Sequence, residues 1–254
     1  MRKTTFTFIW VFIILITLSC KASDRQDNGG TARKTETRQG LSGFSKIDIS
    51  GDIDVYYTQG KKYSVKVIAP QNLLRKVKTN VKNGTLSLWT DNITRWHKTG
   101  EEDDIDIYIT SPDLARVYVK GSGEFEAKKS VKADQLTLLL QGSGDIDMED
   151  VTCSNITGEV RGSGDMDINV TGAKTTRWDL KGSGDIDINQ RHVDQTTVNL
   201  LGSGDIDIKF IDCGSADCRL TGSGDIKLSG QLQSLKKTET GSGSYELHEL
   251  SVRK

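Results

Sequence analysis

Proline and aromatic residues are scarce in this sequence. Only 2 of its 254 residues are Pro, and Phe, Trp and Tyr together make up 6%. So few aromatic side chains argue against a large, aromatic-rich ligand pocket. The 26 Gly are not accompanied by the proline that a collagen-like chain contains. These absences favour a Gly-rich, polar protein built from strands.

The sequence also has no excess of either charge and few residues of the kinds that bind metals. With 34 Lys+Arg against 35 Asp+Glu, its net charge of −1 gives no reason to expect a nucleic-acid partner. Four Cys do not make a disulfide scaffold in a chain of this length. The three His, at positions 97, 192 and 248, fit no zinc-binding spacing. Composition therefore favours an extracytoplasmic, non-enzymatic protein.

The longest apolar run lies at the N-terminus, where Phe6 to Leu18 follows the basic residues Arg2 and Lys3. A run of 13 residues is too short for a stable membrane span but suits the core of a secretory signal. It ends at Ser19-Cys20, which resembles a bacterial lipoprotein signal. We therefore predict a signal peptide over residues 1–19 and a lipid on Cys20. The alternative is an ordinary cleaved signal with an incidental Cys.

Residues 20–40 follow this signal and are almost entirely polar. Residues 21–40 contain no aliphatic side chain larger than Ala, so they bury too little apolar surface to offset the entropy of ordering. We predict a flexible tether that lifts a folded body off a membrane.

A phrase that begins Gly-Ser-Gly recurs through the second half of the chain. It starts at positions 121, 142, 162, 182, 202, 222 and 241, and a related phrase, ISGDIDV, starts at Ile49. A nearly fixed period of about 20 residues is typical of stacked repeats. Apolar residues alternate with polar ones on both sides of each GSG, which predicts two strands joined by a tight turn.

The repeat predicts an all-β parallel β-helix, or β-solenoid, over residues 121–254. A meander of antiparallel hairpins is the competing interpretation. Aligning the units on GSG gives columns of apolar residues that a solenoid would place inside: Ile146, Met166, Ile186, Ile206, Ile226 and Tyr245, and Leu140, Val160, Leu180, Leu200 and Leu220. In a third column Gly158 precedes Trp178 by one coil, so we expect the missing side chain to make room for the indole.

Residues 41–120 contain strand-like phrases without the 20-residue period. We predict an irregular, β-rich N-terminal part that covers the open edge of the first coil. Asn83-Gly84 predicts a hairpin turn, and the one helical candidate is Gln71–Lys76, after Pro70.

The order of these phrases resembles the family called putative auto-transporter adhesin, head GIN domain. The phrases are FSKIDISGDIDVYYTQG, VKVIAPQNLLRKVKT, NGTLSLW, DIDIYITSPDLARVYVKGSG and then the GSG units, which cover roughly residues 41–250. The resemblance implies a parallel β-helix related in shape to pectin-lyase-like folds, in lipoproteins of Bacteroidetes-type bacteria. It also implies a role in cell adhesion without recognised catalytic residues.

Nine Asp residues follow the GSG phrases in two columns that face outward. They are Asp145, Asp165, Asp185, Asp205 and Asp225 in one column and Asp147, Asp167, Asp187 and Asp207 in the next. Coils about 4.8 Å apart would bring these like charges close enough to repel. Three interpretations stay open. Each Asp after the turn accepts hydrogen bonds from the N–H groups of its own GSG, with Arg161 and Lys181 across the turn; calcium bridges neighbouring coils; or the columns form a polyanionic stripe for a partner.

We therefore expect a non-enzymatic outer-membrane lipoprotein that faces the cell surface or the periplasm. It would contact the membrane through its lipid and bind a host or cell-surface protein or glycan through its repetitive face. The alternatives are a structural or envelope-sensing accessory lipoprotein and, third, a pectin-lyase-like enzyme acting on carbohydrate. No cofactor is expected unless calcium binds the Asp columns, and a homo-oligomer stays open. Buried thiols are the default for the Cys residues, with a Cys213–Cys218 disulfide as the alternative.

Overall fold

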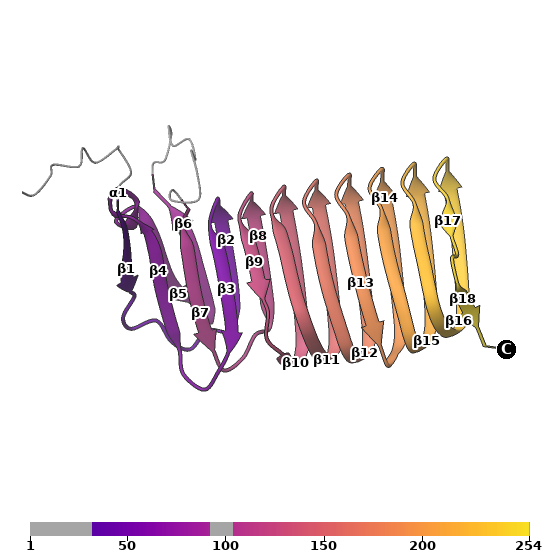
Figure 1. The fold of residues 1–254 in the computed structure, drawn as a ribbon, viewed down its shortest axis with the longest axis horizontal. Helices are drawn as coiled ribbons and strands as arrows, with labels where there is room; N and C mark the ends of the chain where they lie inside the picture. The colour runs from indigo at the N-terminus through magenta and orange to yellow at the C-terminus, as the bar shows by residue number, and fades with distance from the viewer. Residues whose placement is uncertain (1–31, 92–103, 254) are drawn as a thin grey trace, which may run out of the picture. The chain divides into compact units, whose positions relative to one another are not determined.

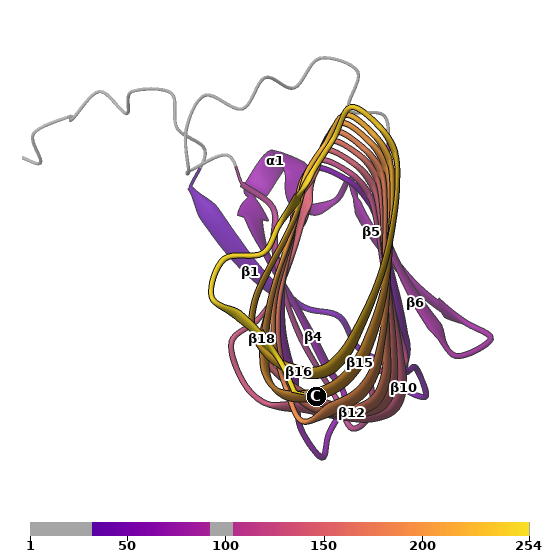
Figure 2. The same cartoon turned by 90° about the vertical axis from the view of Figure 1, so that its right-hand side faces the viewer.

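The structure is a computed structural model that describes residues 32–91 and 104–253. These residues form an 18-stranded sheet with one short helix. Figure 1 shows the strands stacked in a row along the long axis, and Figure 2 shows that each coil is a flattened loop in cross-section. The fold is therefore nearly all-β, as predicted.

The second half of the chain is a β-solenoid of about seven turns between residues 116 and 252. All pairs between its strands are parallel, which excludes the hairpin meander. The register follows the repeat, since Gly142 pairs with Gly162 and Gly162 with Gly182. Its strands are β8 (Arg116–Gly121), β9 (Glu124–Ala127), β10 (Val131–Gly142), β11 (Asp145–Gly162), β12 (Met166–Gly182), β13 (Ile186–Arg191), β14 (Val193–Gly202), β15 (Ile206–Gly222), β16 (Ile226–Gly241), β17 (Tyr245–Glu246) and β18 (Leu250–Val252).

The GSG phrases make the turns along one edge of the stack, which we call the turn edge. Gly142, the first Gly of its phrase, has φ +133°, a conformation that side chains rarely adopt. At the second Gly the coils approach closely, because a Cβ on Gly144 would lie 2.1 Å from the carbonyl oxygen of Gly123. Both glycines are therefore required by the turn and by the stacking. The strand that enters each GSG lies on the first face of the solenoid, and the strand that leaves it lies on the second face.

The core is made of the columns predicted from the repeat. Ile146, Met166, Ile186, Ile206 and Ile226 are buried, and so are Leu140, Val160, Leu180, Leu200 and Leu220, while Tyr245 in the last coil is half-buried. A Cβ added at Gly158 would lie 2.6 Å from two ring carbons of Trp178, whose side chain is fully buried. The size compensation expected between these two residues is confirmed.

The N-terminal part continues the same stack, but out of chain order. Its elements are β1 (Arg33–Thr37), β2 (Lys46–Gly51), β3 (Asp54–Gln59), β4 (Ser64–Pro70), α1 (Gln71–Leu74), β5 (Val77–Lys82), β6 (Thr85–Thr90) and β7 (Asp106–Ser111). Strand β2 lies between β6 and β8, and β3 lies between β7 and β9, all in parallel. The coil formed by β2 and β3 is therefore inserted between two coils that come later in the chain.

The end of the stack is closed by antiparallel strands. β5 pairs with β6, β4 with β7, and β1 with β4. Asn83 and Gly84 both have positive φ, +52° and +74°, in the turn between β5 and β6, so the hairpin predicted there is confirmed. The predicted helix is α1, which begins after Pro70 and is shorter than expected.

Strand β1 lies within residues 20–40, where we expected a flexible tether. Although its residues bury little apolar surface, its backbone pairs with the outer edge of β4. The Arg33 guanidinium donates to Oδ2 of Asp106 (2.6 Å), and Arg38 donates to the carbonyl oxygen of Leu74 (2.8 Å). Backbone pairing and these side-chain bonds order the segment where composition predicted disorder. The predicted signal peptide, Cys20 and the rest of the tether up to residue 31 lie outside the described residues, as does His97.

The alternative of a Cys213–Cys218 disulfide is wrong, because both thiols are free, as is that of Cys153. Cys213 and Cys218 lie on the same strand, β15, with four residues between them. At about 3.3 Å per strand residue, their Cα atoms lie beyond the reach of a disulfide. All three thiols are buried, and burial raises the pKa of Cys218 to about 12.

No helix in the described part of the chain is long and apolar enough to cross a membrane.

Candidate functional site

The two predicted Asp columns lie side by side on the second face, next to the turn edge. We call Asp145, Asp165, Asp185, Asp205 and Asp225 the first acidic column and Asp147, Asp167, Asp187 and Asp207 the second acidic column. Register pairs align Asp147 with Asp167, Asp167 with Asp187, and Asp187 with Asp207. Members of a column are thus one coil apart, about 4.8 Å.

The first acidic column is held by hydrogen bonds between coils. The backbone N–H of Asp165 donates to Oδ1 of Asp145 (3.1 Å), and the N–H of Asp185 donates to Oδ1 of Asp165 (2.9 Å). The same bond joins Asp205 to Asp185 and Asp225 to Asp205, and the N–H and hydroxyl of Ser244 both donate to Asp225. We expected these carboxylates to accept from the N–H groups of their own GSG, and this is wrong. The donor comes from the next coil because each Asp side chain lies beneath the N–H of its counterpart there.

The second acidic column has a different environment. No hydrogen bond or ion pair from any described residue reaches Asp147, Asp167, Asp187 or Asp207. Partial burial raises the pKa of Asp187, and the charges of Asp207 and Asp167 raise it further. Partial burial and the charge of Asp147 raise the pKa of Asp167 in the same way. Four carboxylates in a row therefore repel one another, and the charge of Lys227, in the coil after Asp207, lies at the end of the row.

A basic residue ends the second column on one side, and an ion-paired acid continues it on the other. Lys227 takes the next position after Asp207, and its Nζ lies 3.1 Å from Oδ2 of Asp205. Burial raises the pKa of Asp205, but the hydrogen bonds from Asp225 and Lys227 outweigh it, so the pKa is lowered. At the other end, Glu126 forms an ion pair with Lys128. The acidic face is thus a bounded stripe.

Sequence reasoning missed three members of these columns. Glu124 pairs with Asp145 in the first column, and its own backbone N–H donates to Oδ1 of Asp54 (3.2 Å). Glu126 pairs with Asp147 in the second column. The signal was present for the two Glu residues, because GSGEFEA places acids at the same offsets as the GSGDID phrases. It was not present for Asp54, because Gly51 pairs with Gly121 and this register puts Asp54, not Asp52, beside Glu124.

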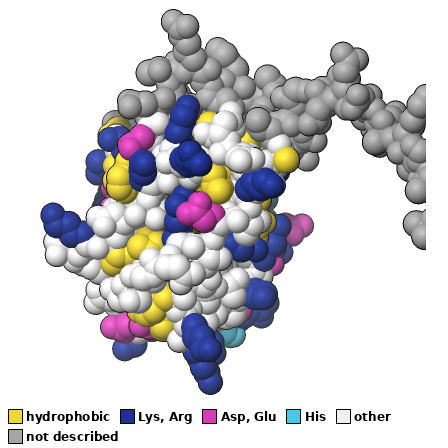
Figure 3. Space-filling view, turned by 90° about the vertical axis from the view of Figure 1, so that its left-hand side faces the viewer, with side chains coloured by type: hydrophobic (Ala, Val, Ile, Leu, Met, Phe, Trp, Pro, Cys, Tyr) yellow, Lys and Arg dark blue, Asp and Glu magenta, His cyan; other side chains and the backbone are white. Residues whose placement is uncertain are grey.

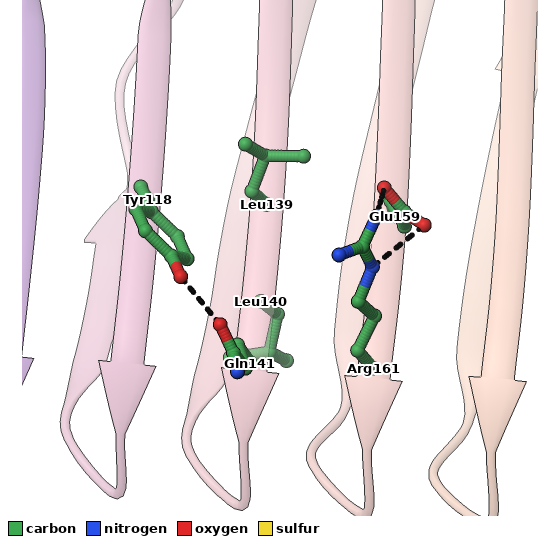
Figure 4. A pocket seen from close by; sticks show the side chains of 6 residues that line it. All are labelled: Tyr118, Leu139, Leu140, Gln141, Glu159 and Arg161. Atoms are coloured by element: carbon green, nitrogen blue, oxygen red, sulfur yellow. Dashed lines mark hydrogen bonds and ion pairs between the residues drawn. The ribbon is translucent and has the colours of Figure 1, made fainter.

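The first face carries charges that neutralise one another. Glu159 accepts hydrogen bonds from Arg161 (2.8 Å) and from Lys181 (2.6 Å), so these basic residues do not lie against the Asp columns as expected. Burial raises the pKa of Glu159, but these bonds outweigh it and the pKa is lowered. Figure 4 shows a depression beside this pair, between Tyr118 and Arg161, with a volume of about 100 Å³. It is too small to enclose a typical small-molecule ligand.

The described residues contain no group of three or more His, Cys, Asp or Glu side chains arranged to hold a metal ion. A calcium ion on the acidic columns would therefore depend on carboxylates of two neighbouring coils and on water ligands. The calcium interpretation stays a prediction.

Comparison with known families identifies the chain. Residues 43–209 and 165–254 match the family described as "Putative auto-transporter adhesin, head GIN domain". The chain belongs to this family. The head GIN domain thus includes the out-of-order N-terminal coils as well as the regular repeat. No curated protein matches the chain.

Solved structures share the whole head GIN fold. A putative adhesin from Bacteroides fragilis is 25% identical, with 85% of this chain and 96% of that one covered at a TM-score of 0.76. A putative adhesin from Parabacteroides distasonis is 20% identical, with coverage of 86% and 98% and a TM-score of 0.69. A putative lipid binding protein from the same species is 23% identical, with coverage of 87% and 97% and a TM-score of 0.65. At these identities the two Parabacteroides proteins support the fold alone.

Proposed function

We propose that this protein is a non-enzymatic adhesin of the bacterial cell envelope and that it binds through the second acidic column. The observation that supports this is the row of four carboxylates that receive no hydrogen bond or ion pair from the described residues. Charges that stabilise a fold are paired, as on the first face. Unpaired, regularly spaced charges suit a partner that supplies the opposite charge.

Family membership supports the adhesive role. The family and the similar protein from Bacteroides fragilis are both described as putative adhesins. A solenoid suits this function because its faces are long and regular, so that many weak contacts add up without a pocket. The partner that fits the acidic face is a basic protein surface, or a glycan bridged to it by calcium.

The experiment measures attachment of protein-coated beads to cells. The full chain is coupled to fluorescent beads, and their binding to bacterial and epithelial cells is counted by flow cytometry. The test variant has all four carboxylates of the second acidic column replaced, Asp147, Asp167, Asp187 and Asp207, each by Asn. We expect at least tenfold fewer attached beads, since several charge contacts are lost together.

The matched control removes four exposed acids that lie elsewhere. The replacements are Asp113→Asn, Asp134→Asn, Glu239→Gln and Glu249→Gln. This control should bind like the parent chain. A chelator is also added to the parent chain. It should abolish attachment through calcium-bridged contacts and leave attachment through direct contacts unchanged. Parent beads that attach no better than blank beads, or a test variant that attaches like the parent, would contradict the proposal.

We also propose that Cys20 carries a lipid that anchors the protein in the outer membrane. The described chain enters the fold at β1, at the end of the stack that Figure 3 shows with many Lys and Arg side chains. Residues 32–91 contain 11 Lys and Arg against 5 Asp and Glu. A basic end suits an anionic lipid surface. In cells, Cys20→Ser should shift the protein from the membrane to the soluble fraction, and equal partition of both forms would contradict the anchor.

A further inference from the structure

The edge opposite the GSG turns carries a continuous groove. Here each coil passes from the second face back to the first, and three depressions lie in a row, with volumes of about 320, 440 and 260 Å³. The first two share Lys132, and the last two share His192 and Asp194. We call this row the corner groove. From Lys132 to Gln233 it crosses five coil steps, about 24 Å at 4.8 Å per step.

Small residues keep the corner groove open. The lining of its middle depression includes the small residues Ala133, Ser154, Gly172 and Ala173. Nothing lies nearer than 4.0 Å to a Cβ added at Gly172, in contrast to the crowded glycines of the turn edge. The groove therefore has room for a ligand between the side chains that form its walls.

The walls are basic and polar. Lys61, Lys132 and Lys174 are exposed and form no ion pair with any described residue. Of the two acids, Asp212 is held by Arg253, with 3.1 Å between Nη1 and Oδ1, and lies 3.7 Å from Nδ1 of His192. Asp194 is the other. Three lysines against two acids, one of which is held by Arg253, leave the lining of the groove with a net positive charge.

The remaining lining residues indicate what kind of polymer fits. Ser154 and Gln233 offer a hydroxyl and an amide group, which match the hydroxyls of a sugar, whereas the amide of Gln59 is already bonded to the backbone of Pro112 and Lys132. No Phe, Trp or Tyr lines the three depressions. Single-stranded nucleic acids bind largely by stacking on such side chains, so their absence disfavours a nucleic acid as the ligand.

We propose that the corner groove binds a linear polysaccharide that carries carboxylate groups, laid lengthwise along the solenoid axis. Lys61, Lys132 and Lys174 pair with its carboxylates. This site deepens the adhesive function by naming a ligand class. It uses a different edge from the second acidic column and needs no calcium.

The experiment measures binding of polygalacturonate, a linear polyuronide, to the purified full chain by calorimetry. The test variant combines Lys132→Glu with Lys174→Glu, and we expect at least tenfold weaker binding. Lys120→Glu is the matched control, since Lys120 is exposed, unpaired within the described chain and beside the turn edge, and it should bind like the parent. Melting curves of all three confirm that they are folded. We expect no binding of neutral dextran.

Two results would overturn the proposal: equal binding of polygalacturonate by the parent and the double variant, or equal binding of single-stranded DNA and polygalacturonate by the parent. The second result would identify a general polyanion surface. Failure here is distinct from failure of the acidic-face proposal, because the variant without the second acidic column keeps the corner groove intact.

Discussion

At the scale of single residues, two carboxylates in one phrase have different surroundings. Asp185 accepts a hydrogen bond from the backbone N–H of Asp205, whereas no described residue donates to Asp187, two positions further on. Both side chains point outward. They differ because the N–H of Asp205, beside the turn, takes the carboxylate as its acceptor, while the N–H groups deeper in the strand are used by the backbone ladder.

This difference predicts opposite effects of removing the two kinds of charge. The pKa of Asp187 is raised in the folded protein, so its charge costs stability at every pH above its folded pKa. Asp187→Asn should therefore raise the melting temperature at pH 7, by about 1 °C because exposed charges are screened. The gain should vanish as the pH falls below about 4, the ordinary pKa of an Asp in the unfolded chain.

Asp205→Asn is the matched comparison. The pKa of Asp205 is lowered, so its charge contributes stability that is present above the unfolded pKa and is lost as the pH falls through the folded value. This variant should melt below the parent at pH 7, and the deficit should shrink in acid. Melting curves between pH 3 and 7 test both variants, and shifts of the same sign at pH 7 would contradict this account.

Single residues also show how far the sequence carries the interpretation. The inward columns and the Gly158–Trp178 pair follow from the period alone, because stacking makes positions about 20 residues apart neighbours. The partners of the polar side chains do not follow from it. Arg161 and Lys181 bind Glu159, on their own face, because a side chain reaches a neighbour on the same face more easily than one across the turn.

At the scale of elements, the coil is the repeating unit of the solenoid. Neighbouring coils share a complete parallel ladder and one column of each kind of core residue. The order of the coils was predictable from residue 121 onward, where each coil follows the last. It was not predictable for β2 and β3. They lie in space between strands that all come later in the chain. Chain order holds no information on such an insertion.

Removing one whole coil should leave the fold intact. Deletion of residues 202–221 joins Leu201 to Gly222, so the GSG turns, the core columns and the first acidic column remain in register. In a stack of nearest-neighbour contacts the loss is one interface, so we expect a cooperative transition at a lower melting temperature. Circular dichroism and gel filtration measure the outcome.

Deletion of residues 202–220 is the control. It removes one residue fewer, which moves the next strand by one position and exchanges its inner and outer side chains. This variant should aggregate or lose its cooperative transition. If both deletions behaved alike, stacking in register would not be what holds the coils together.

At the scale of the whole molecule, charge changes along the stack. The part that contains β1 to β6 is basic, with 11 Lys and Arg against 5 Asp and Glu in residues 32–91, and the later coils are acidic. The basic part repels cationic partners, and the acidic part repels anionic ones. One end of the molecule therefore suits an anionic surface, and the second face suits a cationic one. The net charge of the whole chain, −1, does not reveal this separation.

The parallel ladders have a mechanical consequence. The hydrogen bonds that join the coils run along the stacking axis, so a pull on the two ends opens them one after another from the outermost strand. Each released coil exchanges about 4.8 Å of stack for some 65 Å of extended chain. Under tension, such a protein lengthens in equal steps and takes up the motion of whatever it holds, while the coils that are still stacked keep their shape.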